Sequence, residues 1–145
     1  MRAYLESHRL HGLIHDAFAD NKPVGAICHG VVLVARSLGA DGSSVLHGRQ
    51  TTALLQSQEL LAWSLTRVWL GDYYRTYPQT VQEEVTEALA TPGDFIPGPL
   101  PLRRDSPKNL ASGFALRDGN YLSARWPGDA HRFAQDFCAM LASPR

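Results

Sequence analysis

Two neighbouring residues, Cys28 and His29, place a nucleophile and a proton carrier side by side in the sequence. The apolar run 24–27 precedes them and an apolar run of helical length follows, a pattern that predicts a strand, a sharp turn and a helix. The small residues Ala26 and Gly30 flank the cysteine at the spacing that a tight reversal of the backbone requires. Because the N-terminus of the following helix would point at the sulfur, we expect a lowered thiol pKa and a reactive thiolate.

The same residues allow structural interpretations. Free cysteine is among the most buried residue types, so Cys28 can simply close a buried strand, and His29 can be held by hydrogen bonds with no role in chemistry. A reactive thiol can also serve as an oxidation sensor rather than as a catalyst. If the corner is catalytic, the backbone N–H groups of Gly30 and Val31 at the helix start are suited to binding an oxyanion.

The composition limits the classes of partner. The chain has 145 residues, of which 44% are apolar, and its 14 basic and 14 acidic side chains cancel, so we expect one domain that binds neither nucleic acid nor an anionic membrane. The longest apolar run is too short to cross a bilayer, and the first residues contain no apolar signal core. The two cysteines form no CxxC motif, which favours free thiols in a reducing, cytoplasmic compartment.

Three histidines, His8, His11 and His15, fall on one face of the helix that apolar spacing predicts over residues 7–21. Such spacing is able to bind a divalent transition metal. Solvated histidines on a helix surface are far more common, so we predict no metal site.

The remaining elements follow from periodicity and turn residues. We expect helices from the corner to about residue 38, over 57–70, and from a Thr80–Glu83 capping box to about residues 91–93. Residues 45–47 resemble a short strand, and Asp118-Gly119-Asn120 predicts a hairpin between 114–117 and 121–125. Asp129 is expected to cap a last helix, with Arg125 as its counter-charge.

This set of elements is unbalanced. The strand at 24–27 is continuously apolar and flanked by helices, as central parallel strands are. The chain supplies almost no other strand of that kind to pair with it, so we expect further strands from outside these residues.

The chain resembles the PfpI family of the class I glutamine amidotransferase-like superfamily, the group that includes deglycase and glyoxalase III-type enzymes. The resemblance is carried by Lys22-Pro23-Val24, the Cys28-His29-Gly30 corner, Leu46-His47-Gly48-Arg49 with Thr51-Thr52, and the tail 118–129. It implies an α/β, flavodoxin-like three-layer sandwich with a mainly parallel sheet. Residues 1–145 would be the C-terminal part of that single domain, with an insertion at about 55–112, and a full-length version would begin roughly a hundred residues earlier.

The resemblance also implies a function. It suggests a cofactor-free, cysteine-dependent hydrolase or a glyoxalase/deglycase-type enzyme in which Cys28 is the nucleophile and His29 moves protons, acting on a small molecule or a peptide as a homo-oligomer. The alternatives are a non-catalytic stress or redox-sensing protein and an inactive truncated member of the family.

A third catalytic residue is not evident. The His-Pro-Glu segment of the glutaminase relatives is replaced here by Pro127-Gly128-Asp129 after a tryptophan, so glutamine hydrolysis by that triad is not expected. Glu6 and Asp129 are the carboxylates considered for the site. For each of them a structural role is the preferred interpretation, at the start of a helix for Glu6 and as an N-cap for Asp129.

Overall fold

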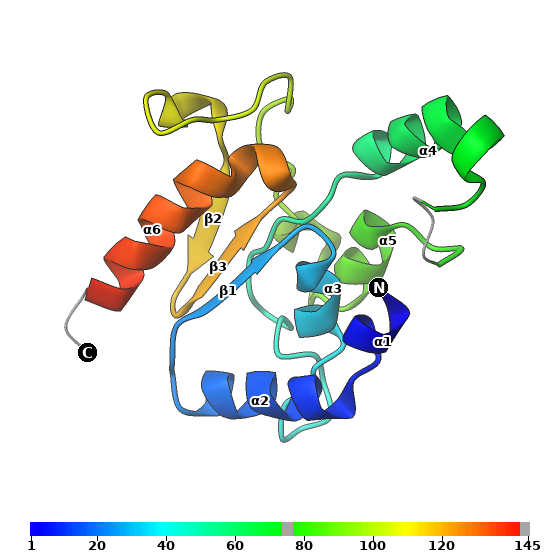
Figure 1. Ribbon diagram of the computed structural model, residues 1–145. Coiled ribbons are helices and arrows are strands. Elements are labelled where there is room, and N and C mark those ends of the chain that lie inside the picture. Colours follow the sequence, from blue (N-terminus) through cyan, green and yellow to red (C-terminus); the bar gives the residue numbers. More distant parts are fainter. Residues whose placement is uncertain (74–76, 143–145) are drawn as a thin grey trace.

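The computed structural model describes residues 1–73 and 77–142 and has an α/β architecture (Figure 1). The described residues form six α-helices, which are α1 (Arg2–Leu5), α2 (His8–Ala19), α3 (Gly30–Ala35), α4 (Gln56–Leu70), α5 (Val81–Glu87) and α6 (Ala130–Ala142). The strands are β1 (Val24–Ile27), β2 (Ala115–Asp118) and β3 (Tyr121–Ala124), and the 3-10 turns are η1 (Pro92–Asp94), η2 (Leu110–Ser112) and η3 (Pro127–Asp129).

The three strands form one small mixed sheet in the order β1-β3-β2. β1 runs parallel to β3 with Val24 opposite Tyr121, and β2 pairs with β3 as an antiparallel hairpin. Gly119 adopts a φ of 59° in the hairpin turn, a conformation that glycine accepts without strain. The expectation of a mainly parallel sheet is therefore met by one of the two pairings.

Helices cover both faces of this sheet. A Cβ atom added to Gly25 would lie 2.8 Å from Cζ of Phe133 and 3.0 Å from the ring of Phe137, so α6 packs directly on the backbone of β1. Side chains alternate along a strand, and Ala26 consequently points to the opposite face, where it joins the hydrophobic core. Glycine at position 25 is what lets the two phenylalanine rings approach the strand.

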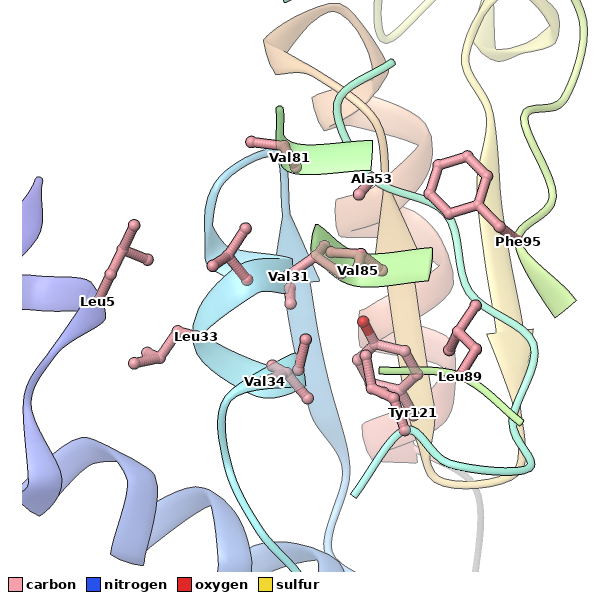
Figure 2. Packing of buried hydrophobic residues seen from close by; sticks show 14 of the residues in the cluster. Leu5, Val31, Leu33, Val34, Ala53, Val81, Val85, Leu89, Phe95 and Tyr121 are labelled. Carbon is pink, nitrogen blue, oxygen red and sulfur yellow. The ribbon is translucent and has the colours of Figure 1, made fainter. Parts of the chain in front are cut away.

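The core lies around α3. Its residues from Val31 to Ala35 are all buried, because a helix that is apolar on every side has to be surrounded by other elements. Val31 and Val34 pack toward Val85 of α5, with Tyr121 of β3 nearby (Figure 2). The α3 helix thus links the sheet to α5.

Several predicted elements are confirmed. The helix expected over 7–21 is α2, where the Ser7 hydroxyl accepts a hydrogen bond from the Leu10 N–H group. The capping box of Thr80 and Glu83 is present at the start of α5. The helix over 57–70 and the hairpin around Gly119 also form as predicted.

Three predictions are wrong in detail. The helix that the capping box opens, α5, ends at Glu87 and not near residues 91–93. Residues 45–47 form a turn and not a strand, because the Ser44 hydroxyl accepts from the Leu46 N–H group and Gly48 takes a φ of 77°. The helix after the corner ends at Ala35 and not near residue 38, since the Ser37 hydroxyl donates to the Leu33 carbonyl oxygen and the chain then turns.

Within residues 1–73 and 77–142, no helix combines the length and the apolar character that crossing a bilayer requires.

Substitution of Gly25 tests the packing of α6 on β1. Gly25→Val should lower the free energy of unfolding by about 1–3 kcal/mol, because the new side chain meets the rings of Phe133 and Phe137. Gly12→Ala is the matched control: Gly12 lies within α2 with open space around it, so alanine there should stabilise by about 0.5–1 kcal/mol. Urea unfolding followed by circular dichroism measures both, and equal stability of the Gly25→Val and parent proteins would contradict this packing.

Candidate functional site

Cys28 occupies the corner between β1 and α3. Its N–H group donates to the Ala124 carbonyl oxygen of β3 at 3.0 Å, and α3 begins two residues later at Gly30. The φ angle of Cys28 is 58°, in the left-handed region that residues with a side chain occupy at a cost of about 1–3 kcal/mol. The predicted strand, sharp turn and helix are therefore confirmed, with the cysteine at the strained position.

The thiol and the imidazole of the next residue lie together. Sγ of Cys28 is 3.5 Å from Nδ1 of His29, and both residues are half-buried. This distance suits a hydrogen bond that involves sulfur, in which the thiol donates to an unprotonated Nδ1. The pair is arranged for transfer of the thiol proton to the imidazole.

The predicted lowering of the thiol pKa is wrong. Burial raises the pKa of Cys28 to about 11, and the carboxylate of Glu59 adds to the increase, while a hydrogen bond from the His29 backbone opposes it. Burial, with a smaller contribution from the positive charge of the Met1 amino group, lowers the pKa of His29. At neutral pH the site therefore holds a neutral thiol beside a neutral imidazole.

The two predicted oxyanion donors lie next to the pair. The Val31 N–H group donates to the Cys28 carbonyl oxygen at 3.2 Å, so it is engaged within the turn. Gly30 lines the cleft beside Cys28 and His29. The oxyanion role of these backbone groups stays a prediction.

A cleft of 810 Å³ opens beside the cysteine. At one end it is bounded by Cys28, His29 and Gly30, together with Met1 and Tyr4 from the start of the chain. From there it continues along β1, where apolar side chains of α2 and of α3 also line it. The thiol and imidazole thus lie at one end of a long, mainly apolar groove.

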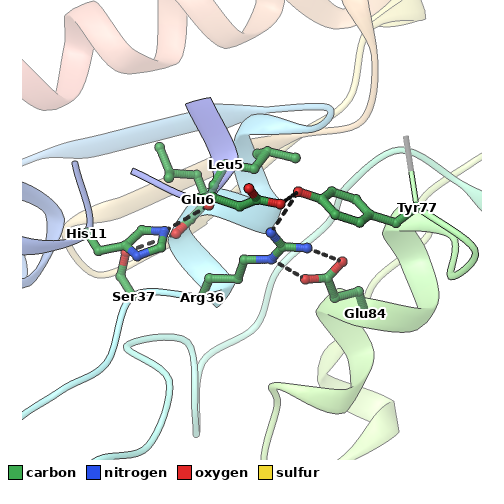
Figure 3. Close-up of polar contacts among 8 residues, drawn as sticks. Leu5, Glu6, His11, Arg36, Ser37, Tyr77 and Glu84 are labelled. Carbon is green, nitrogen blue, oxygen red and sulfur yellow. Dashed lines mark hydrogen bonds and ion pairs between the residues drawn. The ribbon is translucent and has the colours of Figure 1, made fainter. Parts of the chain in front are cut away.

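Glu6 is held in a polar network away from the cleft lining. Its carboxylate accepts a hydrogen bond from the Tyr77 hydroxyl at 2.6 Å, and that hydroxyl accepts from Arg36 at 3.2 Å. Arg36 in turn forms a bidentate pair with Glu84 of α5 (Figure 3). The network ties the end of α1 to α3 and α5, which is a structural arrangement for Glu6.

Asp129 is fully buried and does not act as the N-cap that the sequence predicts. Its two carboxylate oxygens accept from the guanidinium of Arg125 at 2.9 Å each, and also from the N–H groups of Phe114 and Arg125. The N–H group of Arg132 in the first turn of α6 donates instead to Asp105, in the loop before η2. The expected counter-charge, Arg125, is confirmed.

Glu59 is a residue that the sequence reasoning missed. It lies in the first turn of α4 with only 3% of its surface exposed, and its carboxylate accepts the Val81 N–H group at 2.9 Å. Its charge acts on the thiol of Cys28. The available signal was its position as the one acidic residue in the sequence 56–70, directly before Leu60 and Leu61.

The three histidines of α2 have individual contacts. His11 bonds the Leu5 carbonyl oxygen and His15 bonds that of Leu38, while the rings of His8 and His11 meet edge to face. Among the described residues, no group of three or more His, Cys, Asp or Glu side chains is placed to hold a metal ion.

Comparisons with known proteins place the fold. The sequence matches no family model and no curated protein. Similar solved structures include three at 18–20% identity. They are Rapid Encystment Protein 24 kDa (REP24) of Francisella tularensis, with a TM-score of 0.73 over 97% of this chain; the protein APC35852, with 0.71 over 95%; and glyoxalase III of Candida albicans, with 0.65 over 94%. The chain spans only about half the length of each, 52%, 52% and 51% respectively. The likeness shows a shared α/β fold.

Alkylation by iodoacetamide tests the state of the thiol. At pH 8 Cys28 should react roughly a hundredfold more slowly than an ordinary thiol of pKa ~8.5, because little of it is thiolate. The exposed Cys138 is a reference in the same molecule, and mass spectrometry follows both residues. Equal rates at pH 8 would contradict the raised pKa of Cys28, and faster reaction of Cys28 than of Cys138 below pH 7 would support the activated thiolate that the sequence predicts.

Glu59→Gln refines that test. Removing the negative charge should lower the pKa of Cys28 and speed its alkylation, whereas Glu84→Gln, a neighbouring change on α5 that does not act on the thiol, should leave the rate unchanged.

Substitution of Asp129 tests the structural role of its buried ion pair with Arg125. Asp129→Ala should destabilise the protein by about 3–5 kcal/mol, since it leaves the buried guanidinium of Arg125 without its partner. Arg132–Asp136 is a matched pair with the same spacing but partly exposed side chains, so Asp136→Ala should cost less than about 1 kcal/mol. Chemical denaturation measures both, and similar losses would argue against a structural role for the buried pair.

Proposed function

We propose that residues 1–145 are part of a domain of the PfpI type within the glutamine amidotransferase-like superfamily, with a flavodoxin-like three-layer sandwich, and that Cys28 and His29 are its reactive centre. The observation that carries this proposal is the strained corner: Cys28 at a φ of 58° with its sulfur 3.5 Å from the imidazole. The similarity to three α/β structures, one of them a glyoxalase III, supports the fold.

The proposed reaction is addition of the Cys28 thiol to a carbonyl group. A neutral thiol is a weak nucleophile, and the lowered pKa of His29 keeps its imidazole free to accept the proton as the bond forms. Sulfur bonds to the carbonyl carbon, the π electrons pass to oxygen, and the proton moves from sulfur through Nδ1 of His29 to that oxygen. With an aldehyde the product is a hemithioacetal. With an amide the proton goes instead to the departing nitrogen: the C–N bond breaks, the C=O bond re-forms and the amine leaves a thioester on Cys28. Water then hydrolyses this thioester, which releases the carboxylic acid and returns a proton to sulfur.

These two outcomes correspond to the two enzyme classes considered, a glyoxalase/deglycase-type enzyme and a cysteine-dependent hydrolase. Neither requires a cofactor. The substrate is a small molecule or a peptide that presents a carbonyl group at the Cys28 end of the cleft.

Self-association is part of the proposal. α4 leaves large apolar side chains exposed along one stripe, namely Leu61, Leu65, Val68 and Trp69. Contiguous apolar surface of this kind is typical of a protein contact. Burial against the same stripe of a second copy brings no like charges together, because none of these side chains is charged.

A non-catalytic protein is the competing proposal, and the raised pKa of Cys28 is the observation that favours it. A thiol that stays protonated is a poor catalyst unless its neighbour removes the proton. The distinction therefore depends on whether His29 performs that transfer.

Turnover of methylglyoxal and of amide substrates tests the proposal. The parent protein should consume one of them, Cys28→Ala should abolish turnover, and His29→Ala should reduce kcat/KM by about 10²–10⁴. The pKa of His29 is lowered below its usual 6.5, so the imidazole stays unprotonated in mildly acidic solution. Activity should therefore persist there and fall only at a pH below 6.5, where the imidazole takes up a proton. Cys138→Ala is the control that should retain full activity.

Full activity in a folded Cys28→Ala protein would refute the thiol mechanism. Absence of turnover of every carbonyl substrate by the folded parent would favour the non-catalytic alternative.

A further inference from the structure

The side chain of Tyr4 lies at the Cys28 end of the cleft, where it lines the wall together with Cys28, His29 and Gly30. Tyr4 is 45% exposed. Within the described parts of the chain no group hydrogen-bonds its hydroxyl. Because a phenol hydroxyl is a hydrogen-bond donor, Tyr4 offers an unused donor to a molecule bound at this end of the cleft.

The Tyr4 hydroxyl faces an open space beside Gly30. A Cβ atom added to Gly30 would lie 3.6 Å from the hydroxyl oxygen. Apart from the chain neighbours of Gly30 and the backbone of its own helix, no other atom of the described residues would lie within 4 Å. Gly30 is the second residue after Cys28. The absence of a side chain at Gly30 therefore leaves room for a substrate atom between the backbone and the hydroxyl, close to the nucleophile.

The two residues after Tyr4 hold it in position. Leu5 is fully buried, and its carbonyl oxygen is bonded by Nε2 of His11 at 3.0 Å. The carboxylate of Glu6 accepts from the Tyr77 hydroxyl (Figure 3). In addition, α1 packs on α3. A donor that is fixed before the substrate binds stabilises developing charge without a cost of reorganisation.

The proposed reaction develops negative charge on an oxygen atom, because the thiol of Cys28 adds to a carbonyl group and the π electrons pass to oxygen. Two N–H groups at the corner are already engaged: that of Cys28 donates to Ala124, and that of Val31 donates to the Cys28 carbonyl oxygen. A hydrogen bond to a charged oxygen is stronger than one to a neutral oxygen. A hydroxyl directed at this atom would therefore act mainly in the transition state.

We propose that Tyr4 is a further catalytic residue, whose hydroxyl donates a hydrogen bond to the carbonyl oxygen of the substrate while the sulfur of Cys28 adds to the carbonyl carbon. The oxygen lies in the space beside Gly30. Tyr4 keeps its proton throughout, and His29 still carries the proton of the thiol. This inference rests on the proposed function, because it assigns a donor to the reaction proposed for Cys28.

Two reactions of the same thiol test the inference. The ester p-nitrophenyl acetate acetylates a thiol through a tetrahedral adduct, in which the carbonyl oxygen is negatively charged until p-nitrophenolate leaves. Iodoacetamide alkylates a thiol by displacing iodide from a saturated carbon, so no oxyanion forms. Both reagents also react with thiols that are not catalytic, and the comparison does not depend on turnover. Mass spectrometry follows both rates at Cys28, with Cys138 as the reference thiol.

Tyr4→Phe should slow the acetylation of Cys28 by roughly tenfold to a hundredfold, the effect of losing one hydrogen bond to a charged group. It should leave the alkylation rate of Cys28 unchanged, which also shows that the variant is folded around the thiol. Tyr73→Phe is the matched control: Tyr73 is 73% exposed and lies outside the cleft lining, so both rates should equal those of the parent protein.

Gly30→Ala provides a second variant. The added methyl group lies where the substrate oxygen is expected, and its distance of 3.6 Å from the Tyr4 hydroxyl is an ordinary contact that requires no movement. Gly30→Ala should therefore slow the acetylation of Cys28. Tyr4→Phe should add little in this background, whereas two independent effects would multiply.

Equal acetylation rates of Cys28 in the Tyr4→Phe and parent proteins would overturn the proposal. Equal slowing of acetylation and alkylation would also overturn it, because the hydroxyl would then act on the thiol and not on the oxyanion, and so would effects that multiply in the double variant. If the parent protein turns over neither methylglyoxal nor an amide but Tyr4→Phe selectively slows acetylation, the donor role of Tyr4 stands and the proposed enzyme activity fails.

Discussion

The parallel pairing of β1 with β3 is the contact on which the rest of this structure depends. It joins segments near opposite ends of the chain, and it is reinforced where the Asn120 side chain donates to the Lys22 carbonyl oxygen at 2.8 Å. Closing so long a loop is entropically unfavourable, and the loss is offset by burial of α3 and its neighbours behind the strands. The last bond of the ladder, from Cys28 to Ala124, fixes the position of the cysteine.

Two polar sites in the molecule differ in how their groups are satisfied: one is fully buried, and the other is half-buried at the corner after β1. Asp129 and Arg125 stay together as an ion pair because several donors satisfy the carboxylate. Cys28 and His29 have fewer partners, and burial moves the pKa of each toward its neutral form. The difference in hydrogen bonding explains why one site is charged and structural while the other is neutral and able to exchange a proton.

The parts of the fold that were predictable from sequence are those set by local chemistry. The corner at Cys28, the Gly119 hairpin and the capping box of Thr80 each depend on a few adjacent residues. The turn at 45–47 was not predicted because it depends on the Ser44 hydroxyl accepting from the Leu46 N–H group, which competes with an extended conformation.

The errors at the site have a different origin. A helix start beside Cys28 is visible in the sequence, but the burial that outweighs its effect on the thiol pKa comes from distant packing. Glu59 is brought near the site by the packing of α4 on α5. Asp129 binds Arg125, while Asp105 accepts the hydrogen bond from the first turn of α6. These contacts join residues that are distant in the sequence, so the spacing of residues along the chain does not predict them.

The left-handed backbone at Cys28 has a consequence for how this position tolerates change. Glycine adopts a φ of 58° without the strain that any side chain brings, so among all replacements at this corner glycine is the one that the backbone itself favours. Replacing Cys28 with glycine would therefore relieve the strain of the turn but would remove the sulfur atom. A lineage in which the thiol no longer mattered would be free to drift toward glycine here, and a cysteine that persists at this position does so against the preference of its own main chain.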